Sequence, residues 1–462
     1  MSGVTISFLG ATDTVTGSRA LISSQRSKIL VDCGLFQGIK SIQKKNWDPF
    51  PIEANHIDAV VLTHAHLDHC GYLPLLVKQG FNKEIYGTRY TNDIAKVVLR
   101  DSAHLQMEDA KYAAKKGYSS HKDPRALYNL ADAEKAIDHL RERPFREKIQ
   151  ITDDAFVTFY PSGHILGSSF LEVEVAGKSF LFTGDLGRNN HPLLSNPDLP
   201  PKKYFDVIVT ESTYGDRDHE DSPDLFAQEI NAAVQRGGTI LIPAFAIDRT
   251  EVILMALKAL MLENKIPKLP VYVDSPMALA ALNLYREAVA ANAPEIRAGI
   301  SDRFANEDPF DAGSLHQMET TEESKAINNV QGPAIIISAS GMATGGRVVH
   351  HLANMLPSPK NTVILVGYQA VGSRGRFLED GATEIKIHGD LVPVRAHISK
   401  VESFSVHADS DELIAWLRNA KKPKEAFIVH GELEGQQHMQ QRLTDELGWN
   451  ATIPKSGQVF QV

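Results

Sequence analysis

The residues of this chain that are best suited to chemistry lie together in the segment His-Ala-His-Leu-Asp-His, where three histidines and one carboxylate fall within six positions. The apolar run directly before it (Asp-Ala-Val-Val-Leu) is typical of a buried strand, so we expect these residues on the loop at the end of that strand. His64 and His66 can then reach one metal ion, and Asp68 and His69 can reach a second. Imidazole and carboxylate groups are ligands that zinc takes in proteins. A lone histidine is commonly a structural residue, whereas this spacing predicts a metal site.

Four further polar residues follow strand-like runs in the first half of the chain. Asp32 ends an apolar run. Because a buried carboxylate needs a partner, Asp32 is a candidate site residue; the alternative is that it forms a turn before Gly34. His164 lies in a glycine-flanked turn, which beside the first cluster favours a ligand over a core residue. Asp185 and Glu211 each follow a further apolar run, although a surface carboxylate is the alternative for Glu211. Strand ends that meet at one edge of a sheet would bring these side chains into a single site.

From about residue 216 to 384 the pattern changes to alternating strands and helices, which predicts a separate parallel α/β lobe. Two loops of this lobe have the composition of phosphate-binding loops, one with hydroxyl and backbone N–H groups and the other with guanidinium groups. The residues concerned are Ser338, Ser340, Gly341, Arg374 and Arg376. Ordinary Gly/Ser turns are the alternative for both loops.

Two histidines near the C-terminal end would be read as ordinary residues if each stood alone in the sequence. His407 lies in Phe-Ser-Val-His-Ala-Asp before a predicted helix, and His430 follows an apolar run in Val-His-Gly-Glu. In the same chain as the first cluster, both are candidate site residues.

Composition limits the class of protein. A chain of 462 residues exceeds what one hydrophobic core usually holds, so we expect two domains. The net charge of −9 counts mildly against a general nucleic-acid binder, although bound cations would add positive charge locally. The N-terminus lacks the pattern of a signal peptide, and no apolar run is long enough to span a membrane, so we expect a cytoplasmic protein without a membrane partner. The two cysteines, Cys33 and Cys70, cannot form a disulfide framework and read as small buried residues.

The order Asp, His-x-His-x-Asp-His, His, Asp over roughly the first 210 residues resembles the metallo-β-lactamase-fold hydrolases. The glutamate after the next strand, the inserted lobe and the two C-terminal histidine motifs resemble the β-CASP branch of metallo-β-lactamase-fold nucleases. That branch includes bacterial and archaeal RNA-processing nucleases and the endonuclease subunit of the eukaryotic mRNA 3′-end cleavage machinery. The resemblance implies an α/β fold, in which residues 1–211 and 389–462 form an αββα sandwich and residues 212–388 form an inserted parallel α/β β-CASP lobe.

The resemblance also implies a role for each site residue. It implies two zinc ions per chain, the first held by His64, His66 and His164 and the second by Asp68, His69 and His430, with Asp185 bridging them. Asp32 would orient the histidine loop from behind. Two cations about 4 Å apart activate a water, hold a phosphate and offset charge on the departing oxygen. His407 would protonate that oxygen, because histidine can gain a proton near neutral pH, and Glu211 would hold His407 by a hydrogen bond.

These observations predict a zinc-dependent ribonuclease that hydrolyses phosphodiester bonds of single-stranded RNA in RNA processing or decay, as an endonuclease, a 5′-3′ exonuclease or both. RNA is favoured over DNA because family members that act on RNA carry a histidine at the position of His430, where DNA-repair relatives carry an aliphatic residue. The alternatives are a DNA-acting β-CASP nuclease, a small-molecule metallohydrolase of the thioesterase or lactonase type, and a module that holds RNA without cutting it. The small-molecule hydrolase would leave the inserted lobe and His407 without a role. A homodimer is left open, since no residue indicates the oligomeric state.

Overall fold

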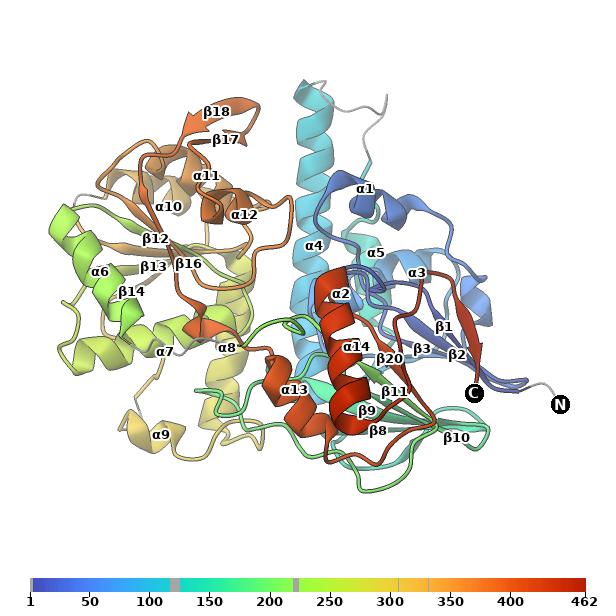
Figure 1. Ribbon diagram of the computed structural model, residues 1–462. Coiled ribbons are helices and arrows are strands. Elements are labelled where there is room, and N and C mark those ends of the chain that lie inside the picture. The colour runs from blue at the N-terminus through green and yellow to red at the C-terminus, as the bar shows by residue number, and fades with distance from the viewer. Residues whose placement is uncertain (1–2, 117–124, 219–223, 306, 331) are drawn as a thin grey trace. The chain divides into compact units, whose positions relative to one another are not determined.

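The computed structural model describes residues 3–116, 125–218, 224–305, 307–330 and 332–462 (Figure 1). Its internal contacts define two compact units: unit 1 comprises residues 1–218 and 407–462, and unit 2 comprises residues 219–406. Unit 2 is therefore an insertion into unit 1.

The sequence placed the second boundary at residue 388, whereas the compact units divide after residue 406. The reason is strand β19 (His397–Lys400), which pairs in parallel with β16 (Thr362–Leu365). The segment between these two boundaries thus completes the sheet of unit 2.

Unit 1 contains two seven-stranded sheets. The first has the order β22-β1-β2-β3-β4-β5-β6, with strands β1 (Thr5–Phe8), β2 (Ala20–Ser23), β3 (Lys28–Val31), β4 (Ala59–Val61), β5 (Ile85–Gly87), β6 (Leu140–Glu142) and β22 (Val459–Gln461). The second has the order β21-β20-β11-β10-β9-β8-β7, with strands β7 (Ile149–Gln150), β8 (Ala155–Pro161), β9 (Ser169–Val175), β10 (Lys178–Phe182), β11 (Val207–Thr210), β20 (Glu425–Ile428) and β21 (Ala451–Thr452).

The two sheets share one apolar core. Ile6 and Val31 from the first sheet belong to the same buried cluster as Phe159 and Val173 from the second. Strand β1 shows the alternating burial expected of a strand with one face in such a core. The two sheets are therefore packed face to face.

Helices cover the outer faces of this sandwich (Figure 1). On the second sheet, α13 (Ser410–Leu417) and α14 (Leu433–Leu447) place Trp416 and Met439 in a second buried cluster with Phe170. Near the first sheet, α4 (Arg89–Lys116) contacts strand β6 and α5 (Leu130–Ile137), which in turn packs on α3 (Leu73–Lys78). The order helix, sheet, sheet, helix is the predicted αββα sandwich.

Unit 2 is built on a six-stranded sheet in which every pairing is parallel. Its order is β14-β13-β15-β12-β16-β19, with the further strands β12 (Ile240–Pro243), β13 (Val271–Val273), β14 (Leu315–Gln317) and β15 (Ile335–Ser338). Its central strands read as continuous apolar runs because both faces of a parallel sheet are covered. The longer helices of the unit are α6 (Leu225–Arg236), α7 (Arg249–Leu262), α8 (Pro276–Ala290) and α11 (Arg347–Met355); α12 (Arg374–Glu379) precedes the hairpin β17 (Glu384–Ile387)–β18 (Asp390–Pro393). The inserted parallel lobe is thus confirmed.

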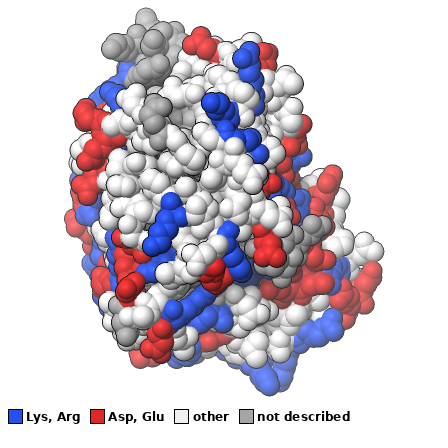
Figure 2. Space-filling view, turned by 90° about the vertical axis from the view of Figure 1, so that its left-hand side faces the viewer, with Lys and Arg blue, Asp and Glu red and all other residues white. Residues whose placement is uncertain are grey.

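The face of the molecule shown in Figure 2 is not marked as a binding face by its charge. On the face shown in Figure 2, basic side chains are scattered among acidic ones, and a wide area carries neither.

Across the described ranges, no helix has both the length and the apolar character that a membrane crossing requires.

Candidate metal centre

The predicted ligands lie on loops that leave strand ends of unit 1. The strands β10, β11 and β20 are parallel neighbours, so the residues that follow their carboxyl ends lie at the same edge of the second sheet. These residues are Asp185, Glu211 and His430, and one ligand atom of each lies within 4.8 Å of the other two. The loop after β4 contains His64 and His66 and turns at once into the short helix α2 (Leu67–Cys70), which contains Asp68 and His69. His164 lies in the loop after β8.

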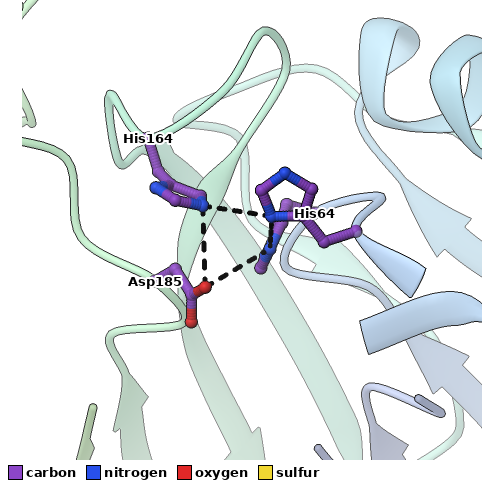
Figure 3. Close-up of side chains that lie close together, drawn as sticks. His64, His164 and Asp185 are labelled. Atoms are coloured by element: carbon purple, nitrogen blue, oxygen red, sulfur yellow. Dashed lines mark hydrogen bonds and ion pairs between the residues drawn. The ribbon is translucent and has the colours of Figure 1, made fainter. Parts of the chain in front are cut away.

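The first cluster consists of His64, His66, His164 and Asp185 (Figure 3). Nδ1 of His66 lies 3.1 Å from Nε2 of His64 and 3.2 Å from Nε2 of His164. Ligands of a tetrahedral zinc ion at the usual bond length lie about 3.3 Å apart. The spacing of the three nitrogens therefore fits one zinc ion at their centre.

The second cluster consists of Asp68, His69 and His430, which also lie within 4.8 Å of one another. Nε2 of His430 lies 3.1 Å from Nε2 of His69 and 3.3 Å from Oδ2 of Asp68. This donor set of two imidazoles and a carboxylate again suits zinc.

Asp185 lies between the clusters and turns one oxygen toward each. Its Oδ2 atom is 3.6 Å from Nε2 of both His64 and His164, and its Oδ1 atom is 3.4 Å from Nε2 of His69. Burial alone would raise the pKa of Asp185, but the neighbouring His430 and His69 lower the pKa well below its ordinary value. A buried anionic carboxylate with this orientation has the geometry of a bridging ligand.

The protonation of the histidines is compatible with metal binding. Burial lowers the pKa of His66 to about 4 and lowers the pKa of His64 and His164 well below the ordinary value. These imidazoles are therefore neutral near pH 7, which is the form that binds metal. For His69, burial would lower the pKa, but the carboxylates of Asp185 and Asp32 raise the pKa well above the ordinary value. Without metal, these carboxylates favour a protonated, positively charged His69. A bound divalent cation would provide that positive charge instead.

Asp32 fixes the histidine loop from behind. Its Oδ2 atom lies 2.8 Å from Nδ1 of His69 and accepts a hydrogen bond from the hydroxyl of Thr63, and its Oδ1 atom accepts one from the backbone N–H of Thr63. The Thr63 hydroxyl is also 3.0 Å from Nδ1 of His64. Asp32 and His430 both have left-handed backbone conformations, with φ of 57° and 52°. Such strained conformations in residues other than glycine cluster at functional sites.

The loop that follows Asp32 is also packed closely against the ligands. A Cβ atom on Gly34 would lie 1.5 Å from the backbone oxygen of Asp68, so only glycine fits there. The buried guanidinium of Arg19 donates from Nε and Nη2 to the Gly34 carbonyl and lies 3.9 Å from the centre of the Tyr72 ring. Sequence reasoning missed both Thr63 and Arg19, because their contacts come from segments distant in sequence.

His407 lies beside the first cluster. Its Nδ1 atom is 3.3 Å from Oε2 of Glu211, and its Nε2 atom is 3.9 Å from Oδ2 of Asp185. Glu211 is buried, whereas His407 keeps partial solvent access. The structure therefore brings both residues to the edge of the first cluster, and their roles as an acid and its support stay predictions.

The five predicted phosphate-binding residues lie in unit 2. Ser338 is buried and donates to the backbone oxygen of Asp274. Ser340 is partly exposed and accepts from the backbone N–H of Thr344, and Gly341 is buried beside it. In this loop, the hydroxyl-bearing residues Ser340 and Thr344 both retain solvent access.

The two arginines are already engaged. The guanidinium of Arg374 donates to three backbone carbonyls, those of Ala343, Thr344 and Lys386. Arg376 forms an ion pair with Asp380. Arg374 thus fastens the serine-containing loop, and phosphate binding by either arginine stays a prediction.

Three family models match the chain. The metallo-β-lactamase superfamily matches residues 17–219, the Beta-Casp domain matches residues 250–378, and a Zn-dependent metallo-hydrolase RNA specificity domain matches residues 391–454. Fold and site together therefore define a metal-dependent hydrolase of the metallo-β-lactamase fold.

Proteins of similar sequence match nearly the whole chain. A ribonuclease of Thermus thermophilus is 35% identical over 92% of this chain and 92% of its own length. An RNase J-like protein of Methanocaldococcus jannaschii is 31% identical over 93% of each chain. Cleavage and polyadenylation specificity factor 73 of Drosophila melanogaster is 30% identical over 92% of this chain and 59% of its own length. The chain belongs to the β-CASP family of metallo-β-lactamase-fold nucleases, which confirms the resemblance and the fold class predicted from the sequence.

Proposed function

We propose that this protein is a zinc-dependent ribonuclease that hydrolyses phosphodiester bonds of single-stranded RNA in RNA processing or decay. The observation that carries the proposal is the position of Asp185 between two clusters of ligand atoms, with His407 next to it. The names of the relatives from Thermus thermophilus and Methanocaldococcus jannaschii support RNA as the substrate.

Two zinc ions fit the residues present. One would be held by His64, His66 and His164 and the other by Asp68, His69 and His430, with Asp185 shared between them. When bound, zinc supplies an activated water and positive charge for the phosphate oxygens. Asp32 and Thr63 keep the ring of His69 turned so that Nε2 points into the site.

His407 supplies the proton that the leaving oxygen needs. Its Nδ1–H donates to Glu211, so Nε2 is the nitrogen directed toward the metal centre. A protonated Nε2 atom at that place can donate to the departing alkoxide. Glu211 acts by orientation, because it contacts His407 rather than the reacting phosphate.

The loop that contains Ser340 supports binding of the RNA backbone. Its exposed hydroxyl and the backbone of a loop fastened by Arg374 provide preorganised hydrogen-bond donors for phosphate. Endonuclease or exonuclease action, a homodimer and a cytoplasmic location stay predictions from the sequence.

The test is a cleavage assay on zinc-loaded protein with end-labelled single-stranded RNA and DNA of one sequence. We expect RNA to be cut, and cutting to be lost in His407→Ala and His430→Ala but retained in His56→Ala, a matched histidine that is exposed at the surface of unit 1. The ladder of products separates endonuclease from exonuclease action. Equal cutting of DNA would overturn the preference for RNA. No cutting of either strand by protein that holds zinc would overturn the nuclease assignment in favour of a small-molecule hydrolase.

A further inference from the structure

A short segment of unit 1 exposes a tryptophan. Helix α1 (Lys40–Gln43) continues directly into the 3-10 helix η1 (Lys44–Trp47), and we call residues 40–47 the Trp47 segment. Trp47 is 58% exposed, whereas Trp416 and Trp449 are only 6% and 4% exposed. An indole left in water is costly to keep, and aromatic rings in this state are the usual platforms for unpaired bases.

The tryptophan is accompanied by basic side chains. Residues 37–47 contain three lysines, at positions 40, 44 and 45, and no acidic residue. Lys40 and Lys44 are exposed, and neither forms an ion pair within the part of the chain that the structure describes. Lys45 lies 3.8 Å from Asp13, and Asp48 follows the segment. The segment therefore carries two exposed ammonium groups as well as the exposed indole, and positive charge is what an RNA backbone requires.

The segment is held rigidly. Asn46 is buried between the exposed residues, and its side chain accepts from the backbone N–H of Phe36 at 2.9 Å and donates to the Phe36 carbonyl at 2.8 Å. The neighbouring Leu35 donates from its backbone N–H to the carbonyl of Leu67 in the ligand loop. The segment that carries Trp47 is therefore connected by hydrogen bonds to residues 35–36, and these in turn to helix α2, which contains Asp68 and His69.

A second connection leads to the other metal cluster. Lys45 approaches Asp13 in the loop that follows β1, and the carbonyl of Ala11 in that loop accepts from the backbone N–H of His430. The Trp47 segment therefore lies beside two of the loops that frame the metal centre, within the same unit.

We propose that the Trp47 segment is a contact surface for single-stranded RNA next to the metal centre. One base stacks on the indole of Trp47, and the ammonium groups of Lys40 and Lys44 neutralise the phosphates on either side of it. The inference rests on the proposed function and adds to it a place where the enzyme holds nucleotides beyond the scissile bond. Because stacking on an indole tolerates every base, this contact favours unpaired strands without selecting a sequence.

Tryptophan fluorescence provides a direct test, because a soluble quencher such as acrylamide reaches the exposed Trp47 far more readily than the two buried tryptophans. The experiment uses zinc-loaded full-length protein that carries His407→Ala, titrated with a single-stranded RNA oligonucleotide. We expect saturable quenching of the emission and reduced access of acrylamide to Trp47. Trp47→Ala should raise Kd about tenfold, with Trp47→Phe retaining most of the affinity. Lys40→Ala with Lys44→Ala should reduce the salt dependence of binding by about two released ions.

Matched controls are available in unit 1. Tyr204 is 51% exposed, so Tyr204→Ala removes an exposed aromatic ring elsewhere. Lys421→Ala with Lys422→Ala removes two exposed charges outside the segment. Neither change should alter Kd, and equal zinc content and circular dichroism spectra show that every variant is folded.

The outcomes separate this inference from the proposed function. RNA cleavage by the wild-type protein, with no quenching and an unchanged Kd in Trp47→Ala, overturns the contact surface and leaves the nuclease. Quenching by RNA together with an absence of cleavage in the wild-type protein supports the contact surface and overturns the nuclease. An equal loss of affinity in Tyr204→Ala and Trp47→Ala would overturn the surface, because binding would then not depend on this segment.

Discussion

The Nδ1 atom of His407 lies 3.3 Å from the Oε2 atom of Glu211, a carboxylate with no exposed side-chain surface. The two residues are 196 positions apart in the sequence, and each is held by its own element: Glu211 follows β11, and His407 precedes α13. This contact determines which nitrogen of the imidazole remains available to a substrate.

Loss of His407 should therefore affect turnover rather than metal binding. We expect His407→Ala to reduce kcat by about 100- to 10,000-fold, because a positioned general acid contributes that much, while zinc content stays the same. Glu211→Gln should cause a smaller loss, since the amide oxygen can still accept from Nδ1. Steady-state kinetics measure the loss of kcat, and metal analysis shows whether zinc binding is unchanged. Full activity in His407→Ala would assign the proton to another group.

The hydrogen bond between Asp32 and His69 predicts an effect on metal affinity. In Asp32→Asn the carboxylate that accepts from the ring is lost, so zinc affinity should fall about 10- to 100-fold. Competition with a chromophoric chelator measures this affinity. Asp138→Asn, at an exposed aspartate of the same unit, is the control and should bind as the wild type does. Equal affinity in both variants would show that Asp32 has no part in orienting His69.

Removal of metal should abolish hydrolysis and lower the melting temperature. A metal that binds only the folded state stabilises it, and the buried carboxylates and imidazoles of the two clusters lose their counter-charge when it leaves. Zinc added back after chelation should restore both properties. Elemental analysis should give two zinc ions per chain, and a fully active protein with one would contradict the bridging role of Asp185.

The close approach of Gly34 to Asp68 predicts a structural effect. The Cβ atom in Gly34→Ala would lie 1.5 Å from a backbone oxygen, so the loop must shift. We expect a loss of about 1–3 kcal/mol in the free energy of unfolding and weaker zinc binding. Gly345→Ala, where a Cβ atom meets nothing within 4 Å, is the control for thermal and chemical denaturation. Unchanged stability in Gly34→Ala would mean that the loop adapts without cost.

The two cysteines should be unreactive in the folded protein. Both are buried, and burial raises the pKa of Cys33 to about 12 from the ordinary 9.0. Because the pKa is higher in the folded state, the stability that Cys33 contributes is present below pH 9 and lost as the pH rises toward 12. A thiol reagent at pH 8 should label neither residue until the protein is unfolded in urea. Rapid labelling of the native protein would contradict this.

Several site residues could be predicted because their signal is local. The spacing from His64 to His69 places four ligand-type groups on one turn after a buried strand, and the structure brings them together. Asp185 is a candidate because it follows an apolar run, whereas His430 becomes a candidate only in the same chain as the first cluster. Their convergence follows from the parallel pairing of β10, β11 and β20, which aligns the carboxyl ends of these strands.

Other features depend on contacts that no local pattern records. Strand β19 belongs to unit 2 because it pairs with β16, and only the fold shows this partner. Arg374 lies in a glycine-rich stretch typical of phosphate binding, yet backbone carbonyls occupy its guanidinium. The exposure of Trp47 is equally invisible in the sequence, because apolar residues are usually buried.

The insertion of unit 2 also determines the order in which the two units are completed during synthesis of the chain. Unit 2 is a continuous stretch, whereas unit 1 needs β20, β21 and β22, which follow it, to complete its two sheets. His430 stands 361 positions after His69, so the second metal cluster lacks a ligand until the last part of the chain has left the ribosome. Domains generally fold as units during synthesis, the N-terminal ones first. A nascent chain therefore contains every residue of unit 2 before His430, a predicted ligand of the second metal cluster, has been added.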